Sequence, residues 1–190
     1  MFNKKQIRKK YSKIRKKNYY EVSKDYFNPL NFFLKKKFKN KKIFLSFYYP
    51  SNYEVNILTL FKVKNFYKKI VSLLPSINGK HNMKFYKWNF LEPLNVNKYG
   101  LLEPYLRKNS YIPHVVLVPL LAFDSRNYRL GYGKGYYDRF LNKYVNLNKR
   151  IVTIGVAFSF QKYNKLPTNI HDVRLNYILT EKGMKKAWTF

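Results

Sequence analysis

The chain has no cysteine, few acidic residues and no long hydrophobic run. Without cysteine, its 190 residues exclude a disulfide framework, a thiol nucleophile and a cysteine zinc site. The three histidines, His81, His114 and His171, are too far apart in the sequence for a local metal-binding motif. No apolar run approaches the length of a membrane span, and the N-terminal stretch lacks the apolar core of a secretory signal. We therefore expect a cytoplasmic protein with no membrane partner.

The scarcity of acidic residues makes the charge balance extreme. The chain has 39 lysines and arginines against 9 aspartates and glutamates, which gives a formal net charge of +30. Such a charge attracts phosphate backbones, so one interpretation is a nucleic-acid-binding protein. The other is a compositional bias, because the abundant Lys, Asn, Tyr, Phe and Ile share codons rich in A and T. The lysines are scattered along the chain, which favours the bias, with a weak polyanion affinity as its side effect.

The remaining composition predicts a folded α/β protein. The chain is 46% hydrophobic and 19% aromatic, so we expect one domain over residues 1–190 with a substantial core. Apolar residues at helical spacing alternate with short, continuous apolar runs, which indicates a single layered domain with a mostly parallel sheet and helices on both faces. The predicted helices are 3–24, 25–40, 54–69 and 135–147, and the predicted strands are 43–49, 70–75, 83–88, 115–121, 150–158 and 177–180. The residues after 180 are expected to form a frayed basic tail.

One stretch joins a buried strand to a basic, glycine-rich loop. Residues 115–139 have the sequence VVLVPLLAFDSRNYRLGYGKGYYDR. The three glycines, Gly131, Gly133 and Gly135, allow backbone N–H groups to face an anion without a Cβ in the way. Lys134 adds a positive charge, and Asp138 follows as a candidate magnesium ligand. A strand that leads through such a loop into a helix is an arrangement that phosphate binding uses.

The loop differs from the two common phosphate-binding motifs. It is not a P-loop, because Lys134 is followed by neither Ser nor Thr, and it is not G-x-G-x-x-G, because the third glycine comes one residue early. Three glycines alone are explained about as well by a tight structural turn. The phosphate interpretation depends on their combination with Arg129, Lys134 and Arg139 and on the carboxylate that follows.

The N-terminal helix carries basic residues whose role charge alone does not decide. Ile7, Tyr11 and Ile14 have helical spacing and are expected to face the core. Lys4 and Arg8 lie one turn apart and share another face. A solvated helix surface explains this face more simply than an anion site does.

The motif RLGYGKGYYD resembles the signature of the 5-formyltetrahydrofolate cyclo-ligases, also called 5,10-methenyltetrahydrofolate synthetases. KKQIRKK (4–10) resembles the N-terminal K-x-x-x-R helix of that family, IFLSF (43–47) its first strand, and LPTNIHDVRLNYILT (166–180) its C-terminal segment. The resemblance thus covers most of the chain. It implies ATP- and Mg²⁺-dependent cyclisation of 5-formyltetrahydrofolate to 5,10-methenyltetrahydrofolate, with release of ADP and phosphate. We expect a monomer with no specific nucleic-acid partner.

The resemblance also implies a role for individual residues. Lys134, together with Arg129, is the predicted catalytic residue that stabilises charge on the transferred phosphoryl group. Asp138 and Asp172 are the implied magnesium ligands; without the resemblance, Asp172 would be interpreted as a helix or turn cap. The implied ATP-binding residues are Lys4, Arg8, Arg129, Leu130, Gly131, Tyr132, Gly133, Lys134, Gly135, Tyr136 and Tyr137.

The implied folate-binding wall departs from the family pattern. The family's E-x-D/E-T pattern best matches EVNI, in which Glu54 is kept but Asn56 and Ile57 replace the usual acid and threonine. An alignment without a gap would put Pro50 in the place of the glutamate. These departures leave a folded but inactive enzyme as an alternative, and core packing explains Trp88 about as well as substrate binding does. The implied substrate-binding residues are Leu45, Glu54, Trp88, Tyr132, Gly133, Lys134, Gly135 and Tyr136.

Overall fold

The fold is organised around a seven-stranded sheet with the strand order β11-β10-β9-β6-β1-β2-β3. The computed structural model describes residues 2–39, 41–63, 69–79, 82–147 and 150–187. The strands from β10 to β2 run parallel, whereas the edge strands β11 and β3 are antiparallel to their neighbours. This confirms the predicted α/β class and the mostly parallel sheet. The strands are β1 (Ile43–Ser46), β2 (Ile70–Asn78), β3 (Asn82–Lys87), β6 (Val115–Pro119), β9 (Val152–Val156), β10 (Tyr177–Thr180) and β11 (Gly183–Lys186).

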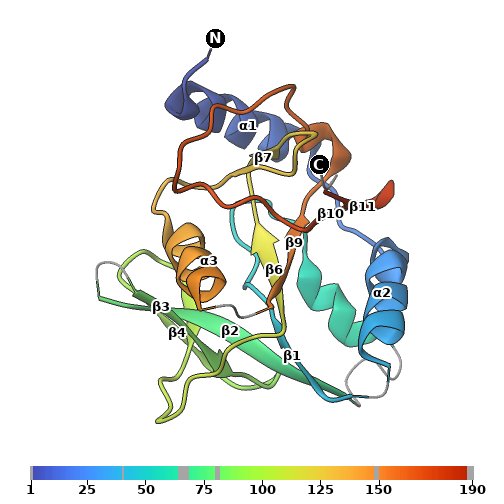
Figure 1. Cartoon of the computed structure of the whole chain (residues 1–190), viewed down its shortest axis with the longest axis vertical. Coiled ribbons are helices and arrows are strands. Elements are labelled where there is room, and N and C mark those ends of the chain that lie inside the picture. Colours follow the sequence, from blue (N-terminus) through green and yellow to red (C-terminus); the bar gives the residue numbers. More distant parts are fainter. Residues whose placement is uncertain (1, 40, 64–68, 80–81, 148–149, 188–190) are drawn as a thin grey trace.

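Helices cover both faces of this sheet (Figure 1). Val115 and Leu117 of β6 point into the core that contains α2 and η2, whereas Val116 and Val118 point into the core that contains α3. Successive side chains of a strand point to opposite faces, so a strand buried on both sides has a continuous apolar sequence. The helices are η1 (Lys24–Phe27), α2 (Asn28–Phe38), η2 (Ile57–Lys62) and α3 (Tyr136–Asn146).

The N-terminal helix α1 (Lys4–Asn18) packs at the end of the molecule to which β6 leads (Figure 1). There the short strands β7 (Ala122–Phe123) and β8 (Arg129–Leu130) form a hairpin. Ile7 and Tyr11 are buried in a small cluster with residues of this hairpin, as predicted, and Ile14 packs against the cluster. Asn3 and Gln6 form a capping box at the start of α1, which satisfies backbone N–H groups that a helix leaves unpaired.

Two helix predictions are wrong in extent. The helix predicted over 3–24 ends at Asn18, because the chain becomes extended at Tyr19 and the rings of Tyr19 and Tyr20 pack against Phe158. The helix predicted over 54–69 is replaced by the six-residue 3-10 helix η2, and residues 64–68 lie outside the described residues.

The cause of the second error lies at the start of η2. The Asn56 side chain accepts a hydrogen bond from the Leu58 backbone and caps η2, so Glu54 remains in the preceding turn.

One strand prediction and the predicted C-terminal tail also need correction. β2 does not end at Pro75 but continues to Asn78 and pairs with β3. Pro75 is tolerated because β1 pairs only as far as Leu73, so no partner strand on that side requires an N–H from the proline. The frayed tail predicted after residue 180 is instead the edge strand β11, which pairs with β10.

The region 76–112 has no regular sequence pattern outside the predicted strand 83–88, and it contains a further hairpin. It consists of β4 (Leu94–Val96) and β5 (Leu102–Pro104). Among the described residues, no helix is both long enough and apolar enough to cross a bilayer.

Candidate functional site

The glycine-rich loop 131–135 lies between β8 and the start of α3. It therefore belongs to the connection that follows the C-terminal end of β6. The loop that contains Glu54 follows the C-terminal end of the neighbouring parallel strand β1. Ligands of open α/β sheets bind at this edge, where the loops after parallel strands meet. Both predicted walls of the site are therefore on the same edge of the sheet.

Two basic residues of α1 reach this edge. The Arg8 Nε atom donates to the Gly131 carbonyl oxygen at 2.9 Å. The Lys4 Nζ atom donates to Asp172 Oδ2 at 2.6 Å. The structure thus brings the face of α1 that carries Lys4 and Arg8 against the glycine-rich loop and Asp172. This face is therefore not a purely solvated surface, and its use as an anion site stays a prediction.

Two of the three glycines have a conformation that other residues rarely adopt. Gly133 has φ +94° and Gly135 has φ +69°, both in the left-handed region. A Cβ on Gly133 would lie 3.0 Å from the Arg8 guanidinium carbon, so this residue also permits a close approach of α1. Gly131 has neither constraint. Immediately after the loop, the N-terminal end of α3 adds the partial positive charge of a helix terminus.

Lys134 is exposed at the tip of the loop. Its Nζ atom lies 5.5 Å from the centre of the Tyr99 ring, and the Tyr99 hydroxyl accepts a hydrogen bond from the Tyr136 hydroxyl at 3.3 Å. A cation–π contact at an exposed position is worth only about 0.5–1 kcal/mol. The ammonium group can therefore turn toward a bound anion at little energetic cost.

Asp138 contacts the chain at the residue that follows Asp172. Asp138 Oδ1 accepts from Arg129 Nη2 at 2.8 Å and from the Val173 backbone at 3.2 Å, which places Asp138 beside the chain at Asp172. Asp172 Oδ2 accepts from Lys4 and from the Asn169 backbone. The predicted turn-capping role of Asp172 is therefore present as well. Arg129 is deeply buried and also donates to the Val173 carbonyl.

This pair of carboxylates fits a magnesium ion. Each uses one oxygen for the contacts above and, among the described residues, has no hydrogen bond on the other. No group of three or more His, Asp or Glu side chains gathers in the part of the chain that the structure describes. Magnesium usually takes one or two carboxylates and completes its shell with waters and phosphate oxygens, so two are sufficient.

Glu54 lies in a buried polar network. Its Oε1 atom accepts from the Tyr132 hydroxyl at 2.9 Å, and its Oε2 atom accepts from the Ser51 backbone at 3.0 Å. Burial raises the pKa of the Glu54 carboxyl, and the nearby Arg15 guanidinium opposes that rise. The contact with Tyr132 joins the predicted folate-binding wall to the glycine-rich loop.

Two predicted substrate contacts are enclosed by the core. Leu45 is fully buried in β1, and Trp88 is buried among aromatic rings with its indole N–H bonded to the Glu92 carbonyl. The burial of Trp88 agrees with the core-packing alternative. For both residues, contact with a substrate stays a prediction.

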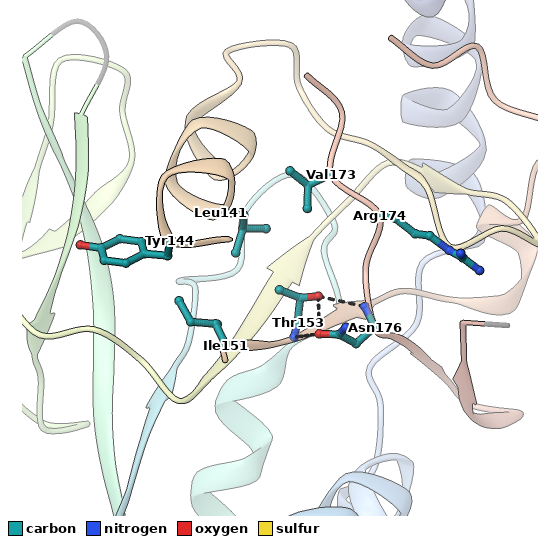
Figure 2. A pocket seen from close by; sticks show the side chains of 7 residues that line it. All are labelled: Leu141, Tyr144, Ile151, Thr153, Val173, Arg174 and Asn176. Carbon is teal, nitrogen blue, oxygen red and sulfur yellow. Dashed lines mark hydrogen bonds between the residues drawn. The ribbon is translucent and has the colours of Figure 1, made fainter. Parts of the chain in front are cut away.

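A pocket elsewhere on the molecule is lined by none of the predicted site residues, although the Val173 backbone bonds Asp138 and Arg129. It lies between α3 and the segments around β9 and β10 (Figure 2). Its polar side chains Thr153 and Asn176 already bind each other through three hydrogen bonds. The pocket is lined by Leu141, Tyr144, Ile151, Thr153, Val173, Arg174 and Asn176.

The sequence prediction missed Arg15 and Tyr99. Arg15 follows Ile7 and Tyr11 at intervals of four residues, so a charged residue on the buried face of the helix was a signal that could have found it. Tyr99 lies between β4 and β5, where the sequence showed no regular pattern.

Comparisons with known proteins agree on one family. Residues 3–181 match the 5-formyltetrahydrofolate cyclo-ligase family. The chain is 35% identical over 135 residues to the 5-formyltetrahydrofolate cyclo-ligase of Mycoplasma genitalium, covering 71% of this chain and 70% of that protein. It is 36% identical over 104 residues to that of Haemophilus influenzae, covering 53% of this chain and only 54% of the relative.

Two solved structures of 5,10-methenyltetrahydrofolate synthetases have similar folds. The NMR structure of 5,10-methenyltetrahydrofolate synthetase from Aquifex aeolicus has a TM-score of 0.74 at 29% identity, covering 98% of this chain and 94% of that chain. A 5,10-methenyltetrahydrofolate synthetase from Mycoplasma pneumoniae has a TM-score of 0.68 at 26% identity, covering 94% of this chain and 98% of that chain.

Proposed function

The chain belongs to the 5-formyltetrahydrofolate cyclo-ligase family, and on that premise we propose that it cyclises 5-formyltetrahydrofolate to 5,10-methenyltetrahydrofolate with consumption of ATP. In the proposed reaction the formyl oxygen attacks the γ-phosphorus of ATP, and the bond to the ADP oxygen breaks. N10 of the folate then attacks the activated formyl carbon and loses its proton to water or to a phosphate oxygen. The carbon–oxygen bond breaks, and phosphate leaves with that oxygen.

The observation that carries this proposal is the convergence of α1 on the glycine-rich loop. Arg8 contacts the Gly131 carbonyl, and Lys4 contacts Asp172, so two cations from one helix face lie beside the loop and a carboxylate. Phosphoryl transfer needs positioned positive charge more than a protein nucleophile. The absence of cysteine is therefore compatible with the chemistry.

Each residue of the site has a role in this proposal. Lys134 turns from Tyr99 toward the transferred phosphoryl group and stabilises its charge. Backbone N–H groups of the loop and of the first turn of α3 bind phosphate oxygens. Arg129 holds Asp138 in place, and Glu54 contributes to the folate-binding wall. Asp138 and Asp172 would hold magnesium, which when bound neutralises charge on phosphate oxygens.

A direct assay tests the proposal. Purified protein would be mixed with 5-formyltetrahydrofolate, ATP and Mg²⁺, and the methenyl product followed by its absorbance together with ADP release. We expect both products in equal amounts and neither when ATP or folate is omitted. If the folded protein forms no methenyl product and leaves ATP intact, the proposed activity is wrong, and a folded but inactive relative is the better description.

A further inference from the structure

The side chain of Arg15 is almost completely buried, at 1% exposure. It leaves α1 on the same face as Ile7 and Tyr11 but carries a charge into the interior. Its Nη1 atom donates to the Leu120 carbonyl at 3.0 Å, and its Nη2 atom donates to the Tyr132 hydroxyl. A buried guanidinium requires compensating partners, because burial of an unpaired charge is strongly unfavourable.

The partner of Arg15 is bonded in turn to Glu54. The Tyr132 hydroxyl accepts from Arg15 and donates to Glu54 Oε1 at 2.9 Å. A hydroxyl has one proton, so the direction of the two bonds is fixed from guanidinium to carboxylate. Such a chain of bonds polarises its members, and each bond strengthens the other. Tyr132 thus connects Arg15 of α1 to Glu54 in the loop after β1.

Among the described residues, the other side chains near Glu54 are uncharged. They include the Ser51 hydroxyl and the Tyr48 and Tyr137 hydroxyls, the last two approaching from the end of β1 and from α3. Tyr48 donates to the Val55 carbonyl, whereas the Tyr137 hydroxyl is buried and has no hydrogen-bond partner among the described residues. Burial next to Glu54 raises the pKa of both phenols, so neither supplies a charge. Arg15 is therefore the cation that balances this carboxylate.

We propose that Arg15 is a positioning residue for the folate side of the site, fixing Glu54 against the glycine-rich loop through the Tyr132 hydroxyl. The inference depends on the proposed function, because Glu54 is the predicted folate contact. Arg15 itself is buried, and its hydrogen bonds go to Leu120 and Tyr132, so it acts on Glu54 through Tyr132. The fork of the guanidinium is needed to reach both Leu120 and Tyr132, which the single ammonium group of lysine would do less well.

The pH dependence of catalysis gives a test that a purely structural role would not pass. In Arg15→Met, Glu54 loses its counter-charge, so the acid limb of kcat/KM for 5-formyltetrahydrofolate should move to higher pH. At neutral pH we expect this parameter to fall at least about tenfold and to recover partly at alkaline pH. Arg15→Lys keeps the charge and should keep the acid limb near its original pH with a smaller loss. Lys16→Met removes a charge from an exposed position of the same helix and should change neither.

A double-mutant cycle separates action through Glu54 from a general loss of structure. If Arg15 acts through Glu54, Arg15→Met combined with Glu54→Gln should be no worse in kcat/KM than the more impaired single variant. Additive losses, or an acid limb that does not move in Arg15→Met, would overturn the proposal. Should Arg15→Met fail to fold, Tyr132→Phe removes the bridging hydroxyl alone, and its acid limb should also move to higher pH.

A measurement without turnover distinguishes this inference from the proposed function. The chain has five glutamates, so ¹³C labelling of their carboxyl carbons gives a small set of NMR signals, and the signal missing in Glu54→Gln assigns Glu54. The titration midpoint of Glu54 should move to higher pH in Arg15→Met and in Tyr132→Phe. The shift in Arg15→Lys should be smaller. An inactive wild type with this pattern would refute the proposed activity only. If the wild type is active but the titration midpoint of Glu54 is the same in these variants as in wild type, only the role of Arg15 is refuted.

Discussion

The cationic side chains beside the glycine-rich loop differ in the contacts that they make. Lys4 is already paired with Asp172, and Arg8 is bonded to the Gly131 carbonyl. Lys134, in contrast, is exposed and contacts the ring of Tyr99. Loss of an exposed side chain with one weak contact leaves the folded state almost unchanged, so its effect on chemistry can be measured separately from stability.

Lys134→Ala should therefore abolish turnover and leave the fold intact. Removal of a positive group that stabilises transition-state charge typically lowers kcat by about 10²–10³-fold. The measurement is steady-state formation of methenyl product, with thermal unfolding as the check of folding. Lys143→Ala, an exposed lysine on α3, is the matched control and should retain full activity. Near-normal turnover in Lys134→Ala would contradict the assigned role.

The buried Glu54 should make folding stability depend on pH. Burial raises the pKa of this carboxyl above its ordinary value. The folded state therefore binds more protons than the unfolded state from about pH 4.3 up to the raised pKa, and the contribution of Glu54 to stability falls as pH rises through that window. In Glu54→Gln this fall is missing. The difference in free energy of unfolding between wild type and variant should thus decrease with rising pH.

Denaturant unfolding over a series of pH values measures this difference. The series should span about pH 4 to 7, the range in which carboxyl groups titrate. A wild-type advantage that stays constant with pH would show that the Glu54 carboxyl titrates alike in the folded and unfolded states.

Single elements differ in how far their sequence decides their structure. The strand β10 was predicted with its observed bounds, because YILT is apolar, β-branched and bounded by polar residues. The helix predicted over 54–69 had good apolar spacing, but the Asn56 cap and the bonds of Glu54 to Ser51 override that pattern. The loop 131–135 was identified from its glycines, whereas the burial of Arg15 depends on Tyr132 and Leu120, which are distant in sequence.

The glycine-rich loop gives a prediction with its own control. Gly133 has φ +94° and stands against the Arg8 guanidinium, so Gly133→Ala introduces both backbone strain and a close contact with α1. Such strain costs about 1–3 kcal/mol. We expect a raised KM for ATP, since the loop and α1 must move apart.

Gly131→Ala adds the same methyl group where no atom lies within 4 Å and φ is ordinary. We expect this variant to resemble wild type in KM for ATP and in thermal stability. Equal effects of the two substitutions would mean that the conformation of Gly133 and its contact with Arg8 do not shape the ATP site.

For the whole molecule, the role of the net charge of +30 distinguishes a cyclo-ligase from the alternative of a nucleic-acid binder. An enzyme depends on a few cations at defined positions, whereas a polyanion binder depends on their sum. Lys35, Lys36 and Lys37 offer a test, because they are exposed in the last turn of α2, which packs on the sheet with η2 and not with the site. Their replacement by glutamine lowers the formal charge from +30 by three and touches no predicted site residue.

We expect the triple variant Lys35→Gln, Lys36→Gln, Lys37→Gln to retain full turnover, because the charges it removes are remote from the glycine-rich loop. Its weak affinity for duplex DNA should fall, and the slope of log affinity against log salt should decrease by up to about 0.9 for each phosphate that the protein no longer neutralises. Lys134→Ala removes one charge and should show the reverse pattern, with turnover abolished and DNA affinity nearly unchanged. Turnover that declines in both variants in proportion to charge would indicate that general electrostatics, and not a defined phosphate site, governs activity. A high affinity for DNA that survives physiological salt would instead favour the nucleic-acid binder.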